Sequence, residues 1–298
     1  MEWDVLIRNG LVIDGTGSEP YTADVAIRND TIDVIERLPA GATDNARIVI
    51  DASGMAIAPG FIDVHGHTDY ELLINPTAES KVMQGITTEI SGNCGFSAAP
   101  ALCDMLRCDQ DNWCARYGVD VRWRTLAEFL DLVEMRGIGI NYATLVGHGV
   151  LRVNVMNYEA RLPSDEELKQ MVNLLVEALE HGAIGMSSGL IYPPGCYAQT
   201  DELIALCRTL RRYDGIYTTH IRDERAELIP ALREAIEISR ESGVPLEISH
   251  HKAVGRASWG KVRETLPIIE RANFWGLDVT CDQYPYIATS TSLKTLIP

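Results

Sequence analysis

A short run early in the chain carries the side chains best suited to bind a metal ion. His65, His67 and Asp69 alternate along the chain directly after a mainly apolar run, residues 61–64. Residues two apart on a β-strand point to the same face, so this spacing brings both imidazoles together. Imidazole is a frequent ligand of zinc. The run therefore predicts a metal site, in preference to the alternative of one core histidine and one surface histidine.

Other metal-ligating side chains also come at the ends of predicted strands. Cys94, in Gly-Asn-Cys-Gly, is interpreted as a ligand rather than as an inert buried thiol. A catalytic zinc has three protein ligands and keeps one position for water. Five candidates are too many for one such ion, so either two metal positions exist or the first two histidines lie beside a site formed mainly by the other three residues. The predicted ligands are His65, His67, Cys94, His220 and His250.

Two further residues are predicted to bind a substrate carboxylate. Lys252 lies on the same strand face as His250, where its ammonium group would suit an anion; a solvated lysine is the alternative. Tyr192, on the loop after a predicted strand, is expected to hydrogen-bond the same group. His148 also follows a predicted strand, and either orients a ligand or is structural. No role is assigned to His181, at a helix end.

Strands and helices alternate from about Ile57 onward, which is typical of β/α units around a parallel sheet. The candidate ligands follow the carboxyl ends of the strands, where (β/α)₈ barrels carry their active sites. Residues 101–124 are irregular and are expected to be an inserted loop. The predicted strands are 57–65, 86–90, 142–147, 183–187, 215–220, 246–250 and 277–282, and the predicted helices are 164–180, 200–212, 225–242 and 258–275.

The predicted fold class is α/β, a (β/α)₈ TIM-type barrel with a small N-terminal β-sandwich domain. Residues 1–55 contain short β-forming runs and turn signals, and are assigned to part of the sandwich. Residues 56–298 are assigned to the barrel. Only seven barrel strands are predicted, and an open sheet leaves unpaired edges. The barrel is therefore expected to be truncated after strand 7, as the front portion of a longer polypeptide.

Composition excludes several classes of function. The formal net charge of −16 argues against a nucleic-acid partner, and 46% hydrophobic residues can fill a large core. The N-terminus lacks the pattern of a signal peptide, and no run is long enough for a membrane span. Seven cysteines do not suggest a disulfide framework. We expect a cytoplasmic protein whose partner is a small molecule, with the oligomeric state left open.

Six segments together resemble one family, the N-acyl-D-amino-acid deacylases (D-aminoacylases) of the amidohydrolase superfamily. They occur in the order found in that family and extend over nearly the whole chain. Such a set is far more specific than His-X-His alone, which indicates only the superfamily. The segments are DVLIRNGLVIDGTG, PGFIDVHGHTD, SGNCGFS, GAIGMSSGLIYPPG, THIRDE and EISHHKAVG.

The resemblance implies zinc at the mouth of the barrel and hydrolysis of N-acyl-D-amino acids to a carboxylate and a free D-amino acid. It implies that Cys94, His220 and His250 hold a tightly bound zinc. His65 and His67 would complete a second, weaker position. Lys252 and Tyr192 match positions expected to contact the substrate carboxylate. Residues 183–190 contain no lysine to bridge two metals, and the cysteine takes that place in this family.

One departure from the family pattern concerns the general base. The family uses an aspartate at the end of the eighth strand, which is expected beyond Pro298. Asp282 belongs to the seventh-strand motif and cannot be assigned that role. A catalytically incompetent fragment is therefore one alternative. A cyclic-amide hydrolase, similar to dihydropyrimidinases and hydantoinases, is another.

Overall fold

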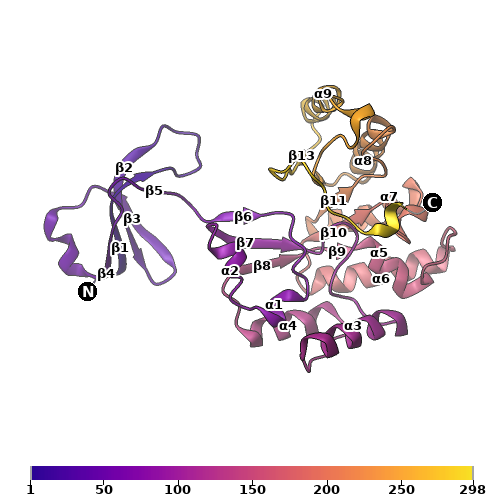
Figure 1. Cartoon of the computed structure of the whole chain (residues 1–298), viewed down its shortest axis with the longest axis horizontal. Helices are drawn as coiled ribbons and strands as arrows, with labels where there is room; N and C mark the ends of the chain where they lie inside the picture. Colours follow the sequence, from indigo (N-terminus) through magenta and orange to yellow (C-terminus); the bar gives the residue numbers. More distant parts are fainter. Residues whose placement is uncertain (1, 297–298) are drawn as a thin grey trace. The chain divides into compact units, whose positions relative to one another are not determined.

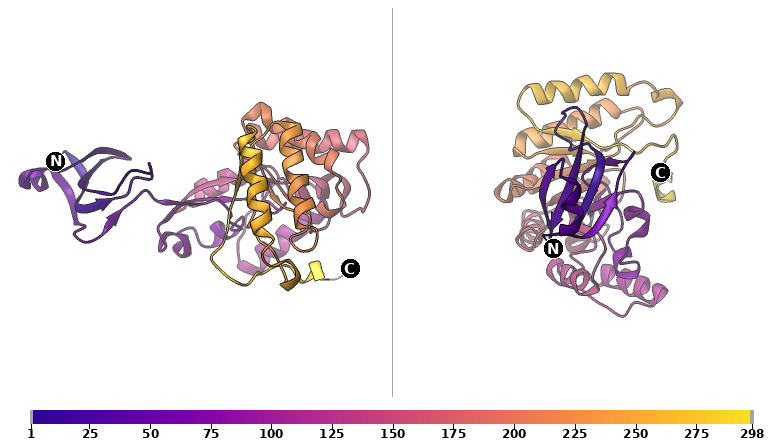
Figure 2. Two further views of the ribbon diagram at one scale, coloured as in Figure 1. Left: turned by 90° about the horizontal axis from the view of Figure 1, so that it is seen from above. Right: turned by 90° about the vertical axis from the view of Figure 1, so that its left-hand side faces the viewer.

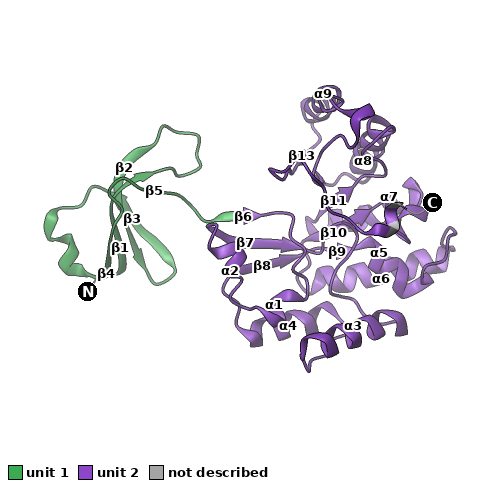
Figure 3. Ribbon diagram, viewed as in Figure 1, with its two compact units in different colours: residues 1–61 green, residues 62–298 purple. Residues whose placement is uncertain are grey.

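The structure is a computed structural model that describes residues 2–296. It consists of two compact units, and the boundary between them lies between Phe61 and Ile62 (Figure 1 and Figure 3). The sequence places the corresponding boundary near residue 55. The candidate ligands all belong to the second unit. No helix in the described part of the chain is long and apolar enough to span a membrane.

Among residues 2–61, the first unit contains one mixed sheet of parallel and antiparallel strands. Strand β1 is its centre: it pairs antiparallel with β2, and parallel with β4 and β5. Trp3, Leu6 and Ala26 form a small buried cluster in this unit. A β-sandwich needs a second layer, which these residues do not contain. The elements are β1 (Trp3–Val12), β2 (Tyr21–Arg28), β3 (Thr31–Glu36), the 3₁₀ helix η1 (Ala40–Asn45), β4 (Ala46–Asp51) and β5 (Ala56–Ile57).

Two sheets with sequential strand order organise the second unit. One contains β6 (Phe61–Asp63), β7 (Ile86–Ser91) and β8 (Asn141–Thr144). The other is parallel throughout and contains, in order, β9 (Val146–Gly147), β10 (Gly185–Gly189), β11 (Ile216–His220), β12 (Leu246–Ile248) and β13 (Val279–Cys281). Strands β6, β8, β9 and β13 are the edge strands of these two sheets among the described residues. This part of the chain is therefore an α/β fold of strand–helix units, without a closed barrel.

Helices connect these strands and pack beside one another. Neighbours in the series α5 to α9 are in contact, and Figure 2 shows α8 and α9 lying side by side. The helices are α1 (Glu71–Ile74), α2 (Glu79–Val82), α3 (Asp104–Tyr117), α4 (Leu126–Arg136), α5 (His148–Met156), α6 (Asp165–Glu180), α7 (Thr200–Leu210), α8 (Leu228–Ser242) and α9 (Val262–Phe274). Short 3₁₀ helices are η2 (Gly195–Tyr197), η3 (Arg211–Tyr213), η4 (Arg256–Ser258) and η5 (Leu293–Leu296).

The ends of α6 and α8 follow the local sequence signals, whereas one predicted loop is a helix. Ser164 and Glu167 form the reciprocal capping box predicted for α6. Gly243, with φ of 71°, ends α8 in a left-handed conformation. The prediction of an irregular loop over residues 101–124 is wrong, because this stretch contains α3. Its apolar periodicity is weak: only Gln110 and Cys114 of the helix are buried, so the pattern gave no helical signal.

The core of the second unit lies between the parallel strands and their helices. Met186 on β10 and Leu246 on β12 are fully buried, and so are Leu206 and Leu232 on the helices α7 and α8. Each fully buried side chain of this size contributes about 1.5–3 kcal/mol relative to an exposed one. Packing of this kind fixes the positions of the strand ends, and therefore of the side chains that follow them.

Close backbone contacts between neighbouring strand ends require glycine. Gly92, just after β7, has φ of 79°, and a Cβ atom built there would lie 2.1 Å from the carbonyl oxygen of Leu145. Gly189, at the end of β10, is equally crowded: its Cβ would lie 2.1 Å from the carbonyl oxygen of Cys94. Both obstacles are backbone atoms, which cannot rotate away. These glycines allow the loop that carries Cys94 to pass between its neighbours.

We expect Gly92→Ala to lower the free energy of unfolding by about 2–4 kcal/mol, the sum of a left-handed backbone penalty and a steric clash. Gly276→Ala is the matched control, because Gly276 has φ of 87° with open space around it. The control should cost only about 1 kcal/mol. Urea unfolding of both variants measures the difference. Equal losses would mean that contact with Leu145 does not restrict this loop.

Candidate metal centre

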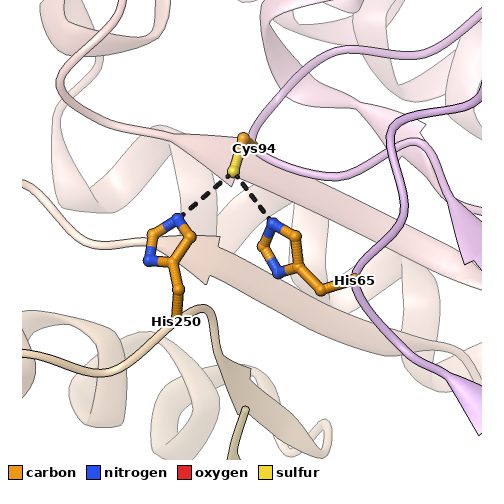
Figure 4. Close-up of side chains that lie close together, drawn as sticks. All are labelled: His65, Cys94 and His250. Atoms are coloured by element: carbon orange, nitrogen blue, oxygen red, sulfur yellow. Dashed lines mark hydrogen bonds between the residues drawn. The ribbon is translucent and has the colours of Figure 1, made fainter. Parts of the chain in front are cut away.

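Four side chains from different strand ends converge on one point. The sulfur of Cys94 lies 3.3 Å from Nε2 of His65, 3.5 Å from Nε2 of His250 and 3.8 Å from Nδ1 of His220. Figure 4 shows the thiol between the rings of His65 and His250. The donor atoms of His65, Cys94 and His250 all lie within 4.8 Å of one another, a spacing compatible with a shared metal ion.

Each of these side chains follows the carboxyl end of a strand. His65 comes two residues after β6, Cys94 three residues after β7, and His250 two residues after β12, whereas His220 is the last residue of β11. Cys94 and His250 both have left-handed backbones, with φ of 54° and 38°. Non-glycine residues rarely adopt this conformation, and strained residues of this kind cluster at functional sites. The backbone is therefore bent where two of the donors are presented.

Buried polar side chains hold the Cys94 loop in place. The hydroxyl of Ser187, on β10, donates to the carbonyl oxygen of Gly92 at 2.5 Å and accepts from the amide of Gly95 at 2.9 Å. The amide group of Asn93 donates to the carbonyl oxygens of Val64 and Ile90, at 3.3 and 3.1 Å. The loop is thus bonded to strands on both sides of it.

Two carboxylates contact the imidazoles on the sides that face away from Cys94. Oδ2 of Asp282 lies 2.9 Å from Nδ1 of His65. Oε1 of Glu224 lies 3.0 Å from Nδ1 of His250 and 3.8 Å from Nε2 of His220. A carboxylate accepts hydrogen bonds, so Asp282 favours a proton on Nδ1 of His65 and leaves the Nε2 lone pair of that ring facing the thiol. Nδ1 of His250 also lies 2.8 Å from the ammonium nitrogen of Lys252.

Burial controls the charge of the central groups. It lowers the pKa of His220 to about 3, against the opposing effect of Glu224. It also raises the pKa of the Cys94 thiol, and the nearby carboxylates of Asp282 and Glu224 raise it further. Burial opposes ionisation of Glu224 as well, but its hydrogen bond with His250 and the neighbouring charges lower its pKa to about 2. The result is a neutral His220 imidazole beside an ionised Glu224 carboxylate.

This donor set has the chemistry of a zinc site. Thiolate and neutral imidazole are the preferred ligands of zinc, and a nearby cation stabilises the thiolate. Nε2 of His220 is buried and has no hydrogen-bond partner among the described residues. The two carboxylates behind the rings match the outer contacts that usually orient metal-ligating histidines. The residues present therefore fit a bound metal ion.

The predicted ligand His67 lies beside this group of convergent donors but is not one of its members. Its side chain is exposed, and its ring centroid is 5.2 Å from that of His65. Among residues 2–296 it shares no cluster of convergent donor atoms with the other four predicted ligands. It does line the adjacent cavity.

A cavity of about 370 Å³ opens beside Cys94 and contains both residues predicted to bind a substrate. The ammonium group of Lys252 is paired with Glu224 and donates to the carbonyl oxygen of His250 at 2.9 Å. The hydroxyl of Tyr192 lies 2.8 Å from that of Thr291. The lining is His67, Cys94, Ile191, Tyr192, His220, Arg222, Asp223, Glu224, Arg225, His250, Lys252, Val254, Tyr284, Thr289, Ser290, Thr291 and Thr295.

His148 belongs to a separate buried network. Its Nε2 lies 2.8 Å from Glu202, whose other oxygen accepts from Arg152 at 2.5 Å. All three side chains are almost completely buried. The arrangement ties α5 to α7, so of the two interpretations offered by the sequence the structural one agrees with these contacts.

Glu224 and Asp282 were not predicted as members of the site. Glu224 lies four residues after His220, within the THIRDE segment, but its charge alone does not separate it from other acidic residues of that loop. The sequence interpretation of Asp282 only excludes it as the general base. Both residues act on histidines that are distant in the sequence, for Asp282 and His65 by 217 positions. Only the folded chain brings these pairs together.

Comparison with known proteins gives consistent relatives. The chain is 42% identical to a D-aminoacylase of Alcaligenes xylosoxydans xylosoxydans, over 98% of the chain and 59% of that protein. It is 40% identical to an N-acyl-D-glutamate deacylase of the same organism, over 97% of the chain and 58% of that protein. The chain thus spans less than three fifths of the length of these curated relatives.

Structural comparison gives the same group. The crystal structure of an N-acyl-D-glutamate deacylase from Bordetella bronchiseptica, complexed with zinc and a phosphonate inhibitor, matches with a TM-score of 0.87 and 38% sequence identity. The match covers 96% of this chain and 59% of that one. A model described as "Amidohydrolase family" matches residues 48–284. The chain therefore belongs to the amidohydrolase family, and its resemblance to the N-acyl-D-amino-acid deacylases is confirmed.

Proposed function

We propose that this chain forms the metal-binding and substrate-binding part of a zinc-dependent N-acyl-D-amino-acid deacylase. The observation that carries the proposal is the convergence of the Cys94 thiol with the imidazoles of His65, His220 and His250. Tight zinc binding is assigned to Cys94, His220 and His250. His65 and His67 are assigned to a second, weaker position that shares the cysteine.

Zinc bound at this centre would lower the pKa of a water molecule towards about 7 and polarise the scissile carbonyl. Two side chains of the protein are assigned to binding the substrate. The ammonium group of Lys252 and the hydroxyl of Tyr192 lie in the cavity beside the thiol and are assigned to the substrate carboxylate. The ring of Tyr192 lies beside the ring of His220, with 5.1 Å between the centroids, and the ammonium nitrogen of Lys252 lies 2.8 Å from Nδ1 of His250. A substrate held by these two groups would therefore place its amide next to the metal ligands.

The side-chain contacts of Lys252 support its role. Glu224 and the carbonyl oxygen of His250 hold its ammonium group at the cavity wall. The chain has a net charge of −16, so a carboxylate substrate needs such a local cation to offset the overall negative field. The paired guanidinium of Arg222 lines the same wall and adds to the local positive potential.

The proposal also covers the architecture around the site. We infer that the two sheets of the second unit belong to one (β/α)₈ barrel, as their sequential, parallel strand order suggests. The general base, an aspartate in this family, is assigned to a position beyond Pro298. The sheet of residues 1–55 is assigned to one layer of a β-sandwich, which agrees with the exposed apolar side chains of Ile32, Ile48 and Ile50.

The metal assignment predicts that Cys94→Ala weakens zinc binding by at least about 100-fold. This exceeds the 10–100-fold loss typical for residues that only support a ligand. Cys108→Ala is the control, because Cys108 is an exposed cysteine on α3. Competition with a chromophoric chelator measures the affinity. Equal zinc affinity of the two variants would exclude Cys94 as a ligand.

The proposed reaction predicts zinc-dependent release of D-methionine, D-leucine or D-glutamate from their N-acetyl forms, with the L-enantiomers as controls. We expect this release from the product of the complete reading frame. If the base lies beyond Pro298, the 298-residue chain should be slower by about 10²–10⁴-fold, the usual contribution of general acid–base catalysis. Turnover of hydantoins or dihydropyrimidines, without turnover of N-acyl-D-amino acids, would instead support a cyclic-amide hydrolase.

The assignment of Lys252 predicts that Lys252→Met raises KM for the N-acyl-D-amino acid by about 10- to 100-fold, because a hydrogen bond to a charged group is lost. The effect on kcat should be small, since the lost interaction exists before and during the reaction. Lys169→Met, an exposed position on α6, is the matched control. Steady-state kinetics of both variants in the product of the complete reading frame provide the measurement. An unchanged KM would contradict this role.

A further inference from the structure

We propose that Asp282 is a positioning residue of the metal centre, which sets the tautomer and direction of His65 and fixes the backbone of His250. This inference rests on the proposed metal site. It differs from a role as general base, because Asp282 does not line the cavity beside Cys94. The carboxylate instead borders a separate cavity of about 400 Å³ on the side of His251.

Both carboxylate oxygens of Asp282 are already used. Oδ2 lies 2.9 Å from Nδ1 of His65, and Oδ1 accepts from the backbone amide of His250 at 2.6 Å. The side chain is only 13% exposed. A base must be free to take a proton from a water molecule or substrate. Both oxygens of Asp282 contact proposed metal ligands, and the carboxylate does not line the cavity proposed for the substrate.

The contact with His65 determines which nitrogen of the ring faces the thiol. An ionised carboxylate can only accept, so Nδ1 of His65 carries the proton. Nε2 then keeps its lone pair, and this atom lies 3.3 Å from the sulfur of Cys94. Carboxylates that hold metal-ligating histidines in this way also raise their basicity. The ring of His65 is therefore prepared to donate its lone pair to a cation.

The contact with His250 acts on the main chain. His250 has φ of 38°, a left-handed conformation that a histidine rarely adopts without support. The bond from its amide to Asp282 is charge-assisted, and two main-chain bonds link the same segments: Asp282 N donates to Ile248 O at 3.2 Å, and His251 N donates to Asp282 O at 2.9 Å. One residue after β13 thus connects the ends of β6 and β12.

The test compares Asp282→Asn with Asp278→Asn. The asparagine oxygen can still accept from the amide of His250, but its NH₂ group would face Nδ1 of His65 and favour a proton on Nε2. Asp278 is exposed, lies four residues earlier in the same segment, and makes no side-chain hydrogen bond among the described residues. Its substitution removes the same charge without touching the site.

Long-range ¹H–¹⁵N correlation spectra of the metal-free chain give the first readout. The chain has seven histidines, so the signals can be assigned by comparison with a His65→Ala variant. We expect His65 to carry its proton on Nδ1 in the wild type and in Asp278→Asn, and on Nε2 in Asp282→Asn. An unchanged tautomer in Asp282→Asn would overturn the inference. This readout does not depend on zinc.

Zinc affinity gives the second readout. We expect Asp282→Asn to weaken binding at the position that includes His65 by about 10–100-fold. In a His65→Ala background the same substitution should have no further effect, since the carboxylate acts through that ring. Additive losses would contradict the inference. A wild-type chain that binds no zinc would overturn the proposed metal site, whereas the tautomer would still decide whether Asp282 orients His65.

Discussion

The position of the Cys94 thiol depends on a loop that passes very close to its neighbours. Gly92 and Gly189 leave room for backbone atoms at distances that no side chain would allow. The hydroxyl of Ser187 then bonds the loop on two sides, to the carbonyl oxygen of Gly92 and the amide of Gly95. The three histidines all lie close to this sulfur atom. A displacement of the loop would therefore separate the thiol from all three imidazoles at once.

A second constraint is the balance of charge around the buried donors. Burial favours neutral imidazoles and a protonated thiol, as the low pKa of His220 and the raised pKa of Cys94 indicate. The carboxylates of Glu224 and Asp282 lie on the outer sides of His250 and His65. A cation placed among these groups would be favoured by the carboxylates and would in turn favour the thiolate. The negative charges of the carboxylates and the thiolate would thus be stabilised by a bound cation.

The cavity beside the centre has a different electrostatic character from the rest of the chain. The protein as a whole is strongly acidic, but three cationic side chains and two carboxylates line this cavity: Lys252, Arg222, Arg225, Asp223 and Glu224. Glu224 links the two regions, because its carboxylate contacts both His250 and the ammonium group of Lys252. Any shift of this residue would affect a proposed metal ligand and a proposed substrate contact together. Metal binding and substrate binding are therefore coupled through the side chain of Glu224.

The sequence alone determined the alternation of strands and helices in the second unit, and the residues that end the strands. Local signals carry that information: the capping box at Ser164, the glycine after α8 and the apolar runs of the strands. It also determined the family, through motifs whose order is specific. The sequence did not predict the weakly amphipathic helix α3, because its buried side chains are too few to produce a helical pattern.

The tertiary structure decided which of the candidate donors meet, and how they are oriented. His65, Cys94, His220 and His250 converge, His67 lies exposed beside them, and His148 belongs to another network. Only folding could reveal the contacts of Asp282 and Glu224. The direction of an imidazole depends on its hydrogen-bond partners, and these come from strand ends far apart in the chain. Spacing along one strand can predict a shared face, but it cannot specify partners that other strands provide.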